Sequence, residues 1–102
     1  DLKQLRSDYG AKHVELTKKL QTIQKEQSKN ISRYNLNEEQ RIEQNKRSTE
    51  YNAKIAGIKK EIAHIQVMMT LTEKSPNAES YISNVKQYEA KKEQVLKQMM
   101  RQ

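Results

Sequence analysis

Residues 51–69 read YNAKIAGIKKEIAHIQVMM, and the large apolar side chains in this run recur at alternating spacings of four and three residues. The residues that follow this spacing are Tyr51, Ile55, Ile58, Ile62, Ile65 and Met69. Such spacing is typical of a helix that packs one narrow apolar edge against another helix, as in a coiled coil. The pattern predicts how the chain packs, but it indicates no reaction and no ligand.

A second run with the same spacing lies nearer the C-terminus. Its apolar residues are Tyr81, Val85, Tyr88, Val95 and Met99. Ser75 and Pro76 precede it and are typical of an N-cap and a first helical residue. Because so short a connection favours an antiparallel return, we expect helices over about 38–73 and 76–101 to form an antiparallel coiled-coil hairpin. Lys92 interrupts the second run and would disfavour slipped pairings.

A weaker apolar stripe marks the beginning of the chain. Leu2, Tyr9, Leu16 and Ile23 repeat every seven residues, but polar residues separate them. We therefore expect a flanking helix over about 2–29. The polar run 28–37 predicts a turn, and Asn37 followed three residues later by Gln40 predicts a capping box. The alternative, in which the first two helices form one continuous rod, stays open.

The two ends of the second helix differ in polarity. Its first turns are polar, so we expect them to pack loosely or to project. At the other end, apolar residues cover several sides of the helix, which predicts burial by more than one neighbour. We take Val67, Met68 and Leu71 as a candidate partner surface. Met99 and Met100 lie about one helix length away from Met68 and Met69, and we expect these methionines to fill core space more than to form a recognition surface.

The composition supports an all-α fold with a thin core. Only 19 of the 102 residues are Leu, Ile or Val, none is Phe or Trp, and there are two Gly and one Pro. That apolar content is near the level of disordered chains, but its helical spacing favours three long helices in one elongated domain, residues 1–102. Because the first residue is Asp, we expect a fragment of a longer chain. A thin core predicts support from a second copy or a partner protein.

Several kinds of site are not expected. The chain has no Cys, which leaves the compartment open, and no stretch of it is typical of a membrane span or a signal peptide, so a cytoplasmic location is only slightly favoured. His13 and His64 lie in no metal-binding spacing. The acid pairs Glu38–Glu39 and Glu89–Glu93 lie on polar helix surfaces. We therefore expect no enzyme, no cofactor, no metal and no small-molecule substrate.

The sequence thus predicts a non-catalytic structural or interaction module that joins copies of itself or other proteins through its helices. A weaker alternative is a basic surface for nucleic acid or anionic membrane. The residues that would form it are Lys59, Lys60, Lys91, Lys92, Lys97 and Arg101. A third alternative, a small helical secretion chaperone or effector, is not distinguished from the first by the sequence.

Overall fold

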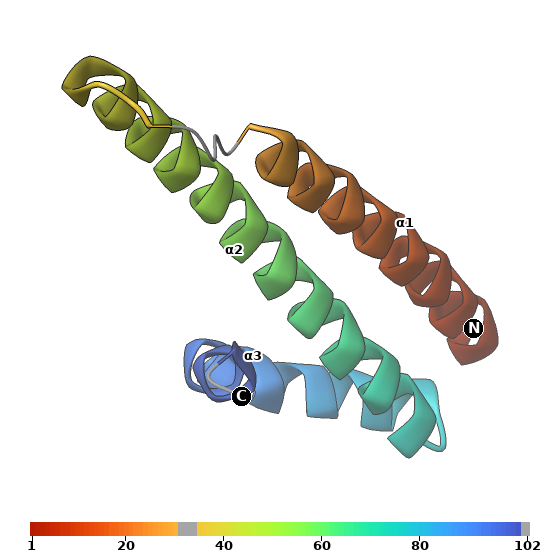
Figure 1. The fold of residues 1–102 in the computed structure, drawn as a ribbon. Helices are drawn as coiled ribbons and strands as arrows, with labels where there is room; N and C mark the ends of the chain where they lie inside the picture. The colour runs from red at the N-terminus through yellow and green to blue at the C-terminus, as the bar shows by residue number, and fades with distance from the viewer. Residues whose placement is uncertain (31–34, 101–102) are drawn as a thin grey trace.

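The computed structural model describes residues 1–30 and 35–100, which form three α-helices and contain no strand (Figure 1). The helices are α1 (Leu2–Lys29), α2 (Glu38–Lys74) and α3 (Ala78–Met100). The all-α prediction is confirmed, and the helix boundaries lie within two residues of those expected. The continuous-rod alternative is wrong, because α1 ends at Asn30 and a separately capped α2 follows. Residues 31–34 of the predicted turn lie outside the described residues.

The start of α2 contains the predicted capping box. The Asn37 side chain accepts a hydrogen bond of 2.7 Å from the Gln40 backbone N–H, and the Asn37 N–H donates to the Gln40 side chain at 3.1 Å. Glu38 and Glu39 lie in the first turn, where the helix dipole favours negative charge. These polar residues therefore fix where α2 begins.

The connection between α2 and α3 differs from the prediction. Ser75 was expected to cap α3, but its hydroxyl donates to the Leu71 carbonyl at 2.6 Å and accepts from the Asn84 side chain at 3.0 Å. Ser75 thus ends α2, and Asn77 caps α3 by accepting from the Ser80 N–H at 2.8 Å. The prediction of Ser75 as N-cap of α3 is wrong, because the hydroxyl of this buried residue is hydrogen-bonded to the last turn of α2.

Helix α2 lies between the other two helices. α1 runs antiparallel along it, and α3 folds back below it and diverges from its axis (Figure 1). Gln27 donates to Asn52 at 2.8 Å across the α1–α2 contact, and Lys60 of α2 lies 3.4 Å from Glu93 of α3. α1 packs along α2 more extensively than α3 does, which differs from our expectation of a merely flanking first helix.

The molecule is elongated and has a small core. Its principal extents are 60 × 25 × 17 Å, and its radius of gyration is 18.3 Å, against about 13 Å for a compact domain of this length. The buried hydrophobic residues are Leu16, Ile58, Ala63, Ile65, Met68, Tyr88 and Leu96. Few side chains therefore hold each pair of helices together.

The first third of α2 projects beyond α1. Asn30, at the end of α1, donates to the Tyr51 hydroxyl at 3.1 Å, so α1 reaches only this level of α2. Residues 38–50 continue past it (Figure 1), and Ile42 in this segment is 63% exposed. The expectation that the polar start of α2 projects is confirmed.

Replacing Asn37 by Ala is expected to fray the projecting segment without unfolding the molecule. Loss of an N-cap costs about 1 kcal/mol, and α1 does not extend along residues 38–50. Hydrogen exchange should therefore accelerate over 38–50 and stay unchanged over 55–72. Asn45→Ala, an exposed change within the same segment, is the control. Equal acceleration in both variants would contradict a role for the cap.

Candidate functional site

The apolar edge of α2 that we predicted from the sequence lies partly against α1. Ile58 and Ile65 are buried, and Tyr51, Ile55, Ile62 and Met69 are half-buried. The Tyr51 hydroxyl accepts a hydrogen bond from Asn30 at the end of α1. Ile58 and Ile62 line surface hollows together with side chains of α1. Part of this edge therefore lies against α1, whereas the sequence pattern led us to expect α3, and Ile62 also shares a hollow with Met99 and Met100 of α3.

The predicted edge of α3 is only partly covered. Tyr88 is buried, and Tyr81, Val85, Val95 and Met99 are half-buried. Leu96, which lies beside this edge, is the most buried side chain, with 1% exposed. In the candidate partner surface, Met68 is buried, so only the half-buried Val67 and Leu71 of that set remain accessible. The α2–α3 contact thus centres on Leu96 and Tyr88.

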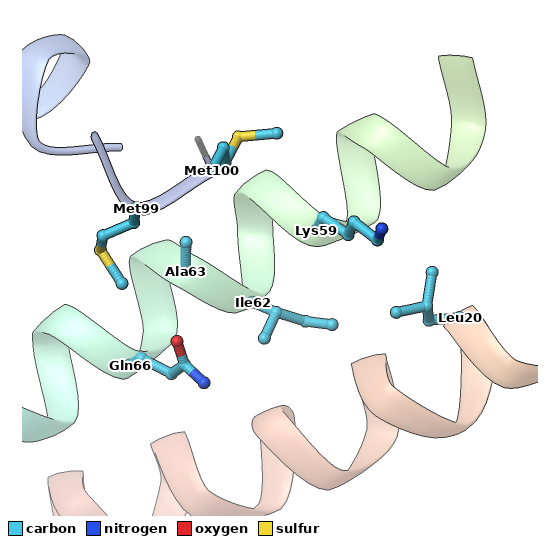
Figure 2. Close-up of a pocket in the computed structure, with 7 residues that line it drawn as sticks. All are labelled: Leu20, Lys59, Ile62, Ala63, Gln66, Met99 and Met100. Carbon is cyan, nitrogen blue, oxygen red and sulfur yellow. The ribbon is translucent and has the colours of Figure 1, made fainter. Parts of the chain in front are cut away.

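All three helices contribute to a hollow of about 340 Å³, which we call the methionine hollow (Figure 2). Its lining residues are Leu20 of α1, Lys59, Ile62, Ala63 and Gln66 of α2, and Met99 and Met100 of α3. Ala63 is directed toward the end of α3, and Ile62 is directed toward Leu20. Met100 is 42% exposed, which differs from the expectation that it fills the core. The hollow therefore presents both apolar and polar surface, with Ile62 and the two methionines beside Lys59 and Gln66.

Lysines border the methionine hollow. Lys59 lines it, and Lys97 lines an adjoining hollow that also includes Met100 and the Lys60–Glu93 pair. The 3.4 Å Lys60–Glu93 ion pair is solvent-exposed, so it contributes little stability. Lys59 and Lys97 form no ion pair with any residue in 1–30 or 35–100. Two unpaired cations thus lie near the same exposed methionine.

A polar contact links α2 to α3 on another side of α2. His64 Nδ1 lies 2.8 Å from the Tyr88 hydroxyl, and the two rings stack with centroids 5.6 Å apart. Burial, and then the nearby Lys92, lower the pKa of His64, while Glu89 acts in the opposite direction. Burial is also the main cause of the raised pKa of Tyr88. His64 therefore takes part in a polar contact between two helices, which the sequence did not indicate.

Stability is expected to fall as the pH is lowered from about 6.5, the pKa of an unfolded histidine. Because His64 has a lower pKa in the folded state, the unfolded chain binds the proton first and gains free energy over the folded one. His64→Gln removes the titrating group, so denaturant unfolding at a series of pH values should show a smaller loss between pH 6.5 and the folded pKa. An unchanged loss in His64→Gln would contradict this assignment.

A second hollow, of about 460 Å³, lies between the beginnings of α1 and α3. Its lining residues are Asp1, Leu2, Gln4, Leu5, Asp8, Ala78, Tyr81 and Ile82. Near it, the hydroxyls of Tyr9 and Tyr81 approach to 3.3 Å and join α1 to α3. Burial, together with this contact, raises the pKa of Tyr81. The charged side chains that line this N-terminal hollow are acidic, in contrast to the methionine hollow.

The lysines predicted to form one basic face are divided among different surroundings. Lys59 lines the methionine hollow, Lys60 pairs with Glu93, and Lys92 lies near His64. Lys91 is exposed, and Arg101 lies outside the described residues. Over the described part of the chain, no group of three His, Cys, Asp or Glu residues could hold a metal ion, and no helix is long and apolar enough to cross a membrane.

Comparison with known proteins adds no relative: no protein-family model, no curated protein and no solved structure matches this chain.

Proposed function

We propose that this chain is a non-catalytic interaction module that uses its helices to assemble with a partner protein. The observation that supports the proposal is its large surface. The chain exposes 8029 Å², whereas a compact monomer of 12.0 kDa would expose about 6,000 Å². A standard interface covers about 800 Å² on each partner. The difference between the exposed area of this chain and that of a compact monomer is thus large enough to supply an interface of ordinary size.

The shape of the exposed apolar surface also favours an interaction role. Two of the exposed large apolar side chains, Met100 and Ile82, line open hollows between helices, where a further helix could pack against them. A catalytic site, in contrast, normally needs convergent polar groups in an enclosed pocket. The basic-surface alternative has less support, because Glu93 pairs with Lys60, which shares hollows with Lys92 and Lys97, and Lys91 lines none of the described hollows.

Two measurements test the proposal. Sedimentation velocity from low micromolar to near-millimolar concentration would detect self-association, and titration with amphipathic helical peptides would detect a helix-binding surface. We expect saturable binding or association that persists at physiological salt. A chain that stays monomeric and binds no helical peptide would contradict the assembly function. Binding only to DNA or anionic vesicles, with a steep loss as salt rises, would favour the basic-surface alternative.

A further inference from the structure

We propose that the methionine hollow binds one amphipathic helix of a partner protein, with carboxylates beside the apolar face of that helix. The proposal rests on the assembly function above and adds where the partner binds and what its chemistry is. It follows from the shape of the hollow, the apolar residues that line it and the two unpaired lysines at its border.

The arrangement of the three helices leaves room for a fourth. α1 and α3 pack on different sides of α2, and the methionine hollow opens where Leu20 of α1 and Met99 of α3 are separated along the α2 surface (Figure 2). A helix with its side chains is about 10–12 Å across, and the molecule is only 17 Å thick in its shortest dimension. A helix added here would contact all three elements, as in a four-helix arrangement.

The lining residues suit an apolar helix face. On α2, the half-buried Ile62 forms the accessible part of the floor, whereas Ala63 is only 7% exposed and is already covered within the chain. Met99 and Met100 are unbranched and flexible, so they can adjust to the side chains of an incoming helix. Because Met100 is 42% exposed, a bound helix would remove a large apolar side chain from water.

The charges determine which helix is preferred. Lys59 lines the methionine hollow together with Met100, and Lys97 lines the adjoining hollow, which also includes Met100. Neither forms an ion pair with a described residue, whereas Lys60 is already paired with Glu93. Carboxylates flanking the apolar face of a partner helix could reach both free ammonium groups. Charge complementarity of this kind chooses between partners more than it adds affinity.

A second copy of this chain fits the hollow less well than a separate acidic helix does. The chain carries a net charge of +7, so a second copy would on balance bring further positive charge to Lys59 and Lys97. The N-terminal hollow provides an internal comparison, because Asp1 and Asp8 line it. A peptide that recognised only apolar surface should favour the N-terminal hollow, which has the more apolar lining, but an acidic one should avoid it.

The test compares two synthetic helical peptides that carry the same leucines at coiled-coil a and d positions. One has Glu at the flanking positions and the other has Lys. Fluorescence anisotropy at physiological salt gives the two dissociation constants, and methyl NMR of the methionines locates the bound peptide. We expect the Glu peptide to bind at least about tenfold more tightly and to shift the Met99 and Met100 methyl resonances more than that of Met68.

Charge-reversal variants separate charge recognition from misfolding. Lys59→Glu/Lys97→Glu should reverse the preference between the two peptides, because both lysines are exposed and the helices should stay folded. Lys91→Glu is the matched control, since Lys91 is exposed on α3 and lines none of the described hollows. It should leave the preference unchanged. Met100→Gln should weaken the binding of both peptides, and circular dichroism should show wild-type helicity in every variant.

Each other outcome has a defined meaning. Equal binding of the two peptides, a preference of the unmodified chain for the Lys peptide, or an unchanged preference in the double variant would overturn the proposed partner chemistry. Peptide binding that shifts Ile82 instead of Met99 would overturn the site, while the assembly function would stand. Self-association that Met100→Gln abolishes would make a second copy the occupant and overturn the acidic partner. A strictly monomeric chain that binds neither peptide would overturn both proposals.

Discussion

Ile58→Asp/Ile65→Asp is expected to remove most of the helical structure. Both isoleucines are 8% exposed and lie seven residues apart on α2. Each substitution places a carboxylate in the core and removes an apolar side chain, and one unpaired buried charge alone typically costs about 4 kcal/mol or more. Domains of about 100 residues have roughly 5–15 kcal/mol of stability, and this small core favours the lower end. Far-UV circular dichroism at 25 °C would measure the loss.

A matched variant of α2 should behave differently. Ile42→Asp/Thr49→Asp also introduces two aspartates seven residues apart, but both positions are exposed on the projecting segment. Its helicity should therefore stay close to that of the unmodified chain. If the two double variants lost the same helicity, the helix propensity of Asp and not burial would explain the effect.

Leu96→Ala is expected to release α3 while α1 and α2 stay together. Leu96 is 1% exposed, and Tyr88 is the other buried residue of α3. Truncation of a buried Leu to Ala costs about 2–5 kcal/mol. Since so few buried side chains hold α3, that loss is a large share of its attachment, and local opening should precede global unfolding. Hydrogen exchange should therefore accelerate by at least about 30-fold over 82–96, since each 1.4 kcal/mol is a tenfold change.

The control for this prediction lies on the same helix. Ile82 is 54% exposed, so Ile82→Ala should change the exchange of α3 very little. Exchange over 10–25 and 52–70 should stay slow in both variants, because the α1–α2 contact is the more extensive one. Equal acceleration over all three helices in Leu96→Ala would show that α3 opens only together with the rest of the molecule.

The helices were predictable from the sequence because their signals are local. The spacing of apolar residues gives the helical period, and the capping box at Asn37 and Gln40 places the start of α2 within one residue. The Ser75–Pro76 signal was misleading because the Ser75 hydroxyl bonds backward to Leu71, within α2. A serine can cap the start of one helix or donate its hydroxyl to a carbonyl at the end of the preceding helix, so the residue type alone does not distinguish the two roles.

Which helix covers which face was harder to predict. The apolar edge of α2 matches the spacing of both α1 and α3, and periodicity alone does not choose between two partners of equal period. The contact between His64 and Tyr88 was missed for a similar reason, because the two residues are 24 positions apart. To predict the methionine hollow, one must know the positions of all three helices. The two consecutive methionines at the end of α3 were nevertheless a signal in the sequence for one part of its lining.

The continuity of α2 gives the molecule a mechanical property. One unbroken helix runs from the three-helix part into the projecting segment 38–50, and at 1.5 Å per residue that segment is about 20 Å long. Anything attached near Glu38 is therefore held at a fixed distance and rotational angle from the methionine hollow. An insertion of seven residues near position 46 would move such an attachment outward by about 10 Å with little rotation, whereas two residues would turn it to another side. The projecting end of α2 thus acts as a rigid spacer.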